Sequence, residues 1–128
     1  MREERSTPPE TVLTAEETQL SAAERLIEAH LADGTFNVDQ LAEAMNYSRR
    51  QLSRILKKQT GLTPARLIQE VRLQRAYRSL EMRTYHTIAE VANSVGFEDP
   101  SYFSKVFVRR FGKTPSEILQ AAAADNLR

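Results

Sequence analysis

The chain repeats one pattern of a short helix, a tight turn and a longer helix, and this repeat constrains the fold more than any other feature. The first copy is VDQLAEAMNYSRRQLSRILKKQTG at residues 38–61, and the second is TIAEVANSVGFEDPSYFSKVFVRRFG at 87–112. The copies align with an offset of 50 residues before the turn and 51 after it. The second turn is therefore one residue longer than the first. Because 128 residues are about the length of one domain, we expect the two similar units to belong to a single domain.

Capping residues and apolar spacing predict helices throughout and no strand. Thr14, Ser48 and Thr87 each have Glu or Gln three residues later, which is the pattern of a capping box. Thr63-Pro64 opens a long helix, because proline suits the first helical position, and this helix is expected over about 64–82. The predicted fold class is all-α: a seven-helix domain with two helix-turn-helix subdomains joined by a long linker helix.

Each copy has the residues that a helix-turn-helix unit requires. Ala42 and Ala92 are small enough for two helices to cross closely. Four positions later, Asn46 and Gly96 are residue types that adopt the left-handed backbone conformation of a sharp turn. Apolar spacing then predicts the buried face of each longer helix, made of Leu52, Ile55 and Leu56 in the first copy and Phe103, Val106 and Phe107 in the second. The opposite face of both helices is left polar.

Charge is distributed unevenly along the chain, although the net charge is only +1. Residues 1–47 carry a net charge of −7, and residues 48–83 carry +8, most of it from Arg. The planar guanidinium of Arg suits both phosphate groups and the edge of guanine, so the basic segment favours a nucleic-acid partner. A solvated helix surface explains a basic run equally well when the run is taken alone.

Composition argues against several other classes of protein. There is no Cys, no glycine-rich phosphate loop and no catalytic set of Ser, His and Asp, so the chain is expected not to be an enzyme. His30 and His86 lack neighbours suited to zinc, and neither a metal nor a cofactor is expected. No apolar run of about 18 residues and no signal segment occurs, so we expect no membrane contact and a reducing, cytoplasmic compartment.

Both ends of the chain are predicted to lie outside the helical domain. Residues 1–13 contain Pro8-Pro9 and several charges, which is typical of a flexible linker or an N-terminal tail. The domain is expected over 14–120, with helix-turn-helix units at about 37–60 and 87–111, and residues 121–128 are expected to form a C-terminal tail. A linker at the N-terminus favours an output domain that is joined to something upstream.

The stretches QLSRILKKQTGLTPARLIQEVRLQRA at 51–76 and IAEVANSVGFEDPSYFSKVFVRRFGKTPSEI at 88–118 resemble the DNA-binding domain of the AraC/XylS regulators. The resemblance spans residues from about 36 to 119. It implies binding to double-stranded promoter DNA and activation or repression of transcription. A linker helix of about 18 residues is ~27 Å long, and with its flanking side chains it matches the ~34 Å between successive major grooves. Two recognition helices are therefore expected in successive grooves.

The family's motif, carried over residue by residue, implies which side chains of the first unit meet DNA. Base contacts are expected from Arg50, Ser53 and Arg54, and phosphate contacts from Arg49 and Lys57. Arg54 is the strongest candidate, because an Arg at this point of a recognition helix can donate two hydrogen bonds to guanine.

In the second unit the same positions carry weaker donors. Base contacts are expected from Ser101, Ser104 and Lys105, and a phosphate contact from Arg109. Pro100 has no side-chain donor, and Asp99 is better used as a helix cap. The second unit is therefore expected to contribute more to positioning than to sequence specificity.

Two further partners are implied by the resemblance: RNA polymerase, and an upstream sensor or receiver module. The alternative hypothesis is a protein-interaction domain that uses its basic face for an acidic partner, which the Arg-rich helix at 48–60 argues against. Not every Arg of the long helix can face DNA, and some are expected to pair with Glu24 and Glu28 of the acidic first helix.

Overall fold

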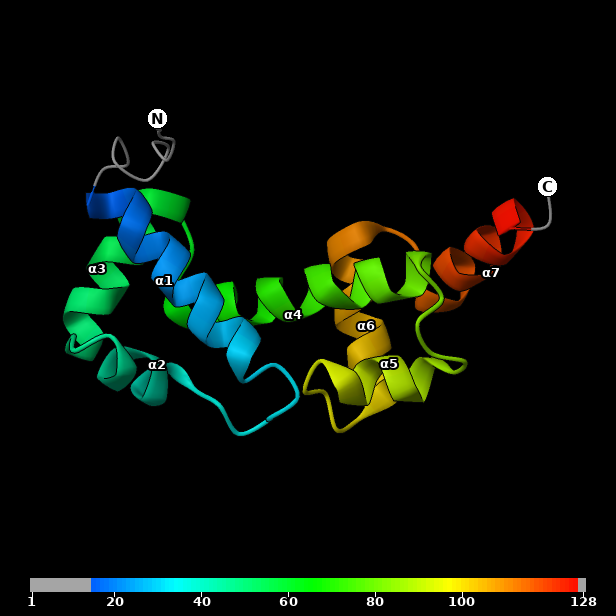
Figure 1. Cartoon of the computed structure of the whole chain (residues 1–128), viewed down its shortest axis with the longest axis horizontal. Helices are drawn as coiled ribbons and strands as arrows, with labels where there is room; N and C mark the ends of the chain where they lie inside the picture. The colour runs from blue at the N-terminus through cyan, green and yellow to red at the C-terminus, as the bar shows by residue number, and fades with distance from the viewer. Residues whose placement is uncertain (1–14, 127–128) are drawn as a thin grey trace, which may run out of the picture.

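The computed structural model describes residues 15–126, and over this range the chain forms seven α-helices and no strand. α4 extends along the molecule and joins α1–α3 at one end to α5–α7 at the other (Figure 1). The predicted all-α, seven-helix fold is confirmed. The helices are α1 (Ala15–Ala29), α2 (Val38–Ala44), α3 (Arg49–Thr60), α4 (Pro64–Glu81), α5 (Ile88–Ser94), α6 (Pro100–Phe111) and α7 (Pro115–Asn126).

The last helix is longer than the sequence pattern predicts. The tail predicted over residues 121–128 is helical as far as Asn126. Residues 121–124 are four consecutive alanines, and Ala has the highest helix propensity, so the helix continues without a breaker. The predicted linker at 1–13 and the capping box at Thr14 lie outside the described residues.

Hydrogen bonds at the helix ends set the boundaries of both units. At the start of α3, Ser48 Oγ accepts the Gln51 N–H at 3.1 Å, and the Gln51 side chain accepts the Ser48 N–H at 2.9 Å. Thr87 and Glu90 form the same reciprocal pair at the start of α5. In both units the turn before the longer helix is left-handed, since φ is 60° at Asn46 and 91° at Gly96. The predicted helix-turn-helix turns are therefore present.

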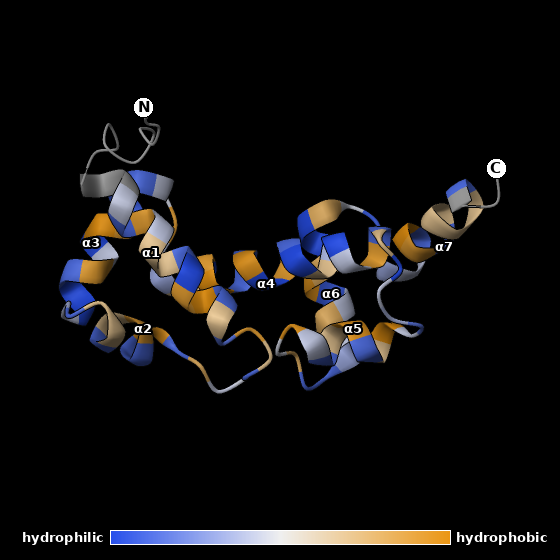
Figure 2. Cartoon of the chain, viewed as in Figure 1, coloured by the Kyte–Doolittle hydropathy of each residue, from blue (hydrophilic) through white to orange (hydrophobic). Residues whose placement is uncertain are grey.

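α4 is shared between two hydrophobic cores, and apolar residues recur along its length (Figure 2). Its first half, through Val71, packs with α1–α3, and its second half, from Leu73, packs with α5–α7. The first core contains Ala23, Ile27, Phe36, Leu41, Ala42, Leu52, Leu56, Leu67, Ile68 and Val71. The second contains Leu73, Ala76, Leu80, Val91, Ala92, Val95, Phe97, Phe103, Val106, Phe107 and Ile118. One continuous helix thus fixes the distance between two separately packed units.

Candidate nucleic-acid interface

α3 and α6 are built as matching elements. Each has 12 residues, begins after an N-cap in extended conformation, and ends at a left-handed glycine. The N-caps, Ser48 and Asp99, are 51 residues apart, as are the glycines Gly61 and Gly112. The two helices occupy separate positions along α4 (Figure 1). The molecule therefore presents the same structural element twice at a fixed separation.

The exposed face of α3 is cationic. Leu52 and Leu56 are fully buried, which turns the opposite side of the helix to solvent. Arg49, Arg50, Arg54 and Lys57 are exposed, and Ser53 is partly buried between them. α3 has no acidic residue to neutralise this face. The structure therefore brings all five side chains that were predicted for the first unit to one helix.

Arg49 has a partner that the sequence did not indicate. Its guanidinium lies 3.2 Å from the Asp39 carboxylate on α2. Both side chains are 67% exposed, so the ion pair is screened by water and contributes little to stability. A phosphate group can therefore replace Asp39 as the partner of Arg49 at low cost.

The exposed face of α6 carries fewer charges. Ser101, Lys105 and Arg109 are exposed and Ser104 is partly buried. Ser104, Lys105 and Arg109 line one shallow hollow together with Val108. Val108 stands where the first unit has Lys57, and it is 38% exposed. Three of the four residues predicted for the second unit thus meet at one place, with an apolar side chain that the prediction omitted.

The first turn of α6 differs most from α3. Asp99 accepts the Ser101 N–H at 2.9 Å, so its carboxylate serves the helix cap as expected. Tyr102 is 52% exposed, and its ring centroid lies 6.2 Å from that of Phe97. Phe103 and Phe107, which were predicted to be buried, are buried, and so is Phe97. Tyr102 is therefore the aromatic residue of this segment that can reach a ligand.

A bidentate ion pair holds the C-terminal half of α6 on α4. Arg110 Nε and Nη2 donate to the two carboxylate oxygens of Glu70 at 2.8 and 2.7 Å. Gln74 also donates to Glu70 at 2.8 Å. The hydrogen bonds from Arg110 lower the pKa of Glu70, and this carboxylate in turn raises the pKa of Arg110. The pair orients the second recognition helix from the linker helix.

We expect Glu70→Gln to destabilise the domain at neutral pH by roughly 1 kcal/mol, because the pair is partly exposed. The folded-state pKa of Glu70 lies below its unfolded value. Its contribution is therefore fully present above the unfolded pKa of about 4.3 and is lost as pH falls through the folded value. Urea unfolding of both proteins between pH 7 and 3 measures the difference in unfolding free energy, which should shrink toward the acid end. A constant difference would show that the carboxylate charge is irrelevant.

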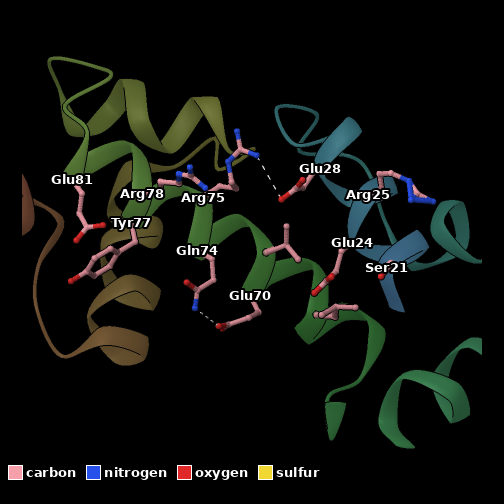
Figure 3. A pocket seen from close by; sticks show the side chains of 12 residues that line it. Ser21, Glu24, Arg25, Glu28, Glu70, Gln74, Arg75, Tyr77, Arg78 and Glu81 are labelled. Atoms are coloured by element: carbon pink, nitrogen blue, oxygen red, sulfur yellow. Dashed lines mark hydrogen bonds and ion pairs between the residues drawn. The ribbon is translucent and has the colours of Figure 1, made fainter. Parts of the chain in front are cut away.

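Two arginines of α4, Arg72 and Arg75, make contacts within the protein. Arg75 pairs with Glu28 of α1 at 3.6 Å, which confirms the expected link to the acidic first helix. Both residues belong to a groove between α1 and α4 whose walls carry charges of both signs (Figure 3). Arg72 donates to the backbone carbonyl of Asp33 at 2.9 Å. These contacts tie α4 to the first unit.

Two ligand classes find no support in the described part of the chain. Over residues 15–126, no cluster of three or more His, Asp or Glu side chains could hold a metal ion. None of the seven described helices is long and apolar enough to cross a membrane. The candidate interface rests instead on the exposed faces of α3 and α6 described above.

Two helix-turn-helix units on one connecting helix, with exposed basic side chains on both recognition helices, define the class of the protein: a DNA-binding domain. A family model described as a helix-turn-helix domain matches residues 41–121, which is more than half of the chain. The chain belongs to the AraC/XylS family of helix-turn-helix DNA-binding domains. These are domains of transcription regulators, so the matched region is a DNA-binding domain and not a catalytic one.

Three relatives illustrate the similarity. The histidine kinase P4 of Formosa agariphila is 37% identical over 112 residues, which is 87% of this chain and 8% of that protein. The transcriptional activator RhaS of Escherichia coli is 40% identical over 94 residues, which is 73% of this chain and 33% of RhaS. The DNA-binding domain of the transcriptional factor AdpA, solved with a target DNA, aligns with a TM-score of 0.74 and 28% identity, covering 86% of this chain and 96% of that domain. The chain thus spans a third or less of the two curated relatives.

Proposed function

We propose that this domain places α3 and α6 in successive major grooves of one promoter duplex and thereby regulates transcription. The observation that carries the proposal is the duplication itself: two helices of 12 residues, each with a side-chain N-cap and a left-handed glycine at its end, lie on a linker helix of 18 residues. At ~1.5 Å per residue, that helix spans most of the ~34 Å between grooves. The AdpA domain, which is similar in fold, was solved with its target DNA.

In the first unit we assign base contacts to Arg50, Ser53 and Arg54, and phosphate contacts to Arg49 and Lys57. The support is their shared exposed face on α3 and the absence of acidic residues from that helix. Arg54 projects from the middle of the helix, and within residues 15–126 it makes no ion pair or hydrogen bond that would have to be broken before it donates to a guanine edge.

In the second unit we assign base contacts to Ser101, Ser104 and Lys105, and a phosphate contact to Arg109. Val108 beside them offers an apolar surface that suits the methyl group of thymine. Because the first turn of α6 has no cationic side chain, this unit contributes less specificity than α3.

We infer that the domain is the output part of a longer cytoplasmic regulator. The matched region is 8% of the histidine kinase P4 and 33% of RhaS, so in both relatives most of the chain lies elsewhere. In this interpretation an upstream sensor or receiver module supplies the signal, and RNA polymerase is the partner that the bound domain recruits or blocks.

Selection of bound duplexes from a random pool, followed by affinity at several salt concentrations, tests the function. We expect an enriched site with two elements about one helical turn apart. Arg49→Ala, Lys57→Ala and Arg109→Ala should each reduce the slope of log affinity against log salt by about 0.9, because each removes one phosphate contact.

Arg25→Ala is the matched control, since Arg25 lies on α1 beside the groove between α1 and α4 (Figure 3) and should leave the slope unchanged. A single enriched element would contradict the two-groove proposal. Weak, sequence-blind binding would instead favour a protein-interaction domain that uses the basic face for an acidic partner.

A further inference from the structure

The two units meet at a second place besides the continuous helix α4. The loop after α1 lies beside the turn between α5 and α6 (Figure 1). A Cβ on Gly34 would lie only 2.7 Å from the carbonyl oxygen of Gly96, and a Cβ on Gly96 would lie 2.7 Å from that of Leu31. Leu31 packs against both hydrophobic cores. The backbones of the two units therefore approach as closely as glycine allows.

Arg72 occupies the centre of this contact. It lies on α4 between Val71, which belongs to the first core, and Leu73, which belongs to the second. Its Nη2 donates to the Asp33 carbonyl at 2.9 Å, and its guanidinium carbon would lie 3.1 Å from a Cβ on Gly96. One side chain thus contacts the loop of the first unit and the turn of the second.

The loop that meets Arg72 is itself held in shape. The Asp33 carboxylate accepts the backbone N–H of Thr35 at 2.9 Å and its hydroxyl at 2.6 Å. These hydrogen bonds lower the pKa of Asp33 and keep the acid charged. The Asp33 carbonyl accepts the backbone N–H of Phe36 at 3.1 Å, and its second lone pair accepts from Arg72. The acceptor is therefore preorganised before the two units meet.

The position of Arg72 is costly in isolation. Burial lowers the pKa of its guanidinium, and the nearby Asp33 charge opposes this shift. Its Nε is buried and makes no hydrogen bond within the described residues. A buried donor without a partner costs free energy. An Arg72 side chain turned to solvent would avoid this desolvation cost. Its contacts with both units are the interactions that offset the cost in the folded protein.

We propose that Leu31, Asp33, Gly34, Arg72 and Gly96 form a clasp that fixes the orientation of one recognition helix relative to the other, with Arg72 as its positioning residue. Long helices curve to different degrees, so the length of α4 alone does not set the angle between the units. A second contact removes that freedom. If the two-groove function proposed above holds, the clasp determines which spacing between two DNA elements is bound.

Distance measurements without DNA test the conformational part. The chain contains no Cys, so spin labels react only with the cysteines introduced by Glu43→Cys and Asn93→Cys. The labels then report the distance between α2 and α5. Both positions are exposed and lie outside the proposed DNA contacts. Double electron–electron resonance should give a narrow distribution of label-to-label distances in the parent protein. The distribution should be broadened or displaced with Arg72→Ala or Gly34→Ala, and intermediate with Arg72→Lys. Arg75→Ala, three residues along the same helix, should resemble the parent.

DNA binding tests the consequence. On a selected two-element site, one base pair inserted between the elements should lower the affinity of the parent protein about tenfold. This is the loss typical of one charge-assisted contact. Arg72→Ala should bind both spacings about equally and each isolated element as the parent does. Gly34→Ala keeps every core side chain and tests the same point if Arg72→Ala fails to fold.

The outcomes separate the two proposals. An unchanged distance distribution in Arg72→Ala, or an unchanged spacing preference, would overturn the clasp while leaving the two-groove function standing. A parent protein without any spacing preference would overturn the two-groove function, and the assigned role of the clasp in DNA spacing would fall with it.

Discussion

Arg54→Ala is expected to lower affinity for the selected DNA site by about 1–3 kcal/mol and to relax the preference at one base pair. Arg54 lies in the middle of the exposed face of α3, flanked by other cationic or polar side chains. Its guanidinium can donate two hydrogen bonds to guanine, whereas Ala leaves those acceptors without a partner. Competition binding on the selected site and on its single-base variants measures both effects.

Arg25→Ala removes the same charge from α1 and serves as the control for general electrostatics. It should change affinity little on any duplex. Equal losses for Arg54→Ala on every base variant would make Arg54 a phosphate contact and would contradict its assignment to base recognition. Lys105→Ala in the second unit should cost less than Arg54→Ala, because Lys has no planar pair of donors.

Phe107→Ala is expected to lower the free energy of unfolding by about 3–5 kcal/mol, since a large cavity replaces a fully buried ring. The Phe107 ring centroid lies 4.7 Å from that of Phe111, 5.6 Å from Phe103 and 5.9 Å from Tyr77. These rings join α6 to α4. None of these aromatic rings belongs to the first core, so the loss of stability should be confined to α5–α7. Urea unfolding gives the total effect, and amide hydrogen exchange shows where protection is lost.

Val108→Ala provides the comparison on the same helix. Val108 is the next residue and is 38% exposed, so its truncation should change stability by less than about 1 kcal/mol. If Phe107→Ala reduced protection in α2 and α3 as much as in α5 and α6, the two cores would form one cooperative unit. The expectation that the loss is confined to α5–α7 would then be wrong.

Local signals in the sequence predicted the elements and most of the candidate interface. Ser48 with Gln51 sets the start of α3, and Asn46 takes the left-handed turn before it, because these interactions involve residues close in the chain. Apolar spacing separated the buried from the exposed face of each recognition helix. The extension of α7 to Asn126 rests on an equally local signal, the run of alanines, that the predicted domain boundary overlooked.

By itself, the sequence determined the helices, their caps, the duplicated unit and the polar face of α3, since each follows from hydrogen bonds or periodicity over a few residues. Tertiary structure alone decided which charges pair. Glu70 pairs with Arg110 across 40 residues, and Arg72 donates to the backbone carbonyl of Asp33 across 39. Such contacts depend on how helices cross, and an exposed Arg in a sequence does not reveal whether it faces a phosphate, a carboxylate or a backbone carbonyl. The angle between the two units is set by that packing.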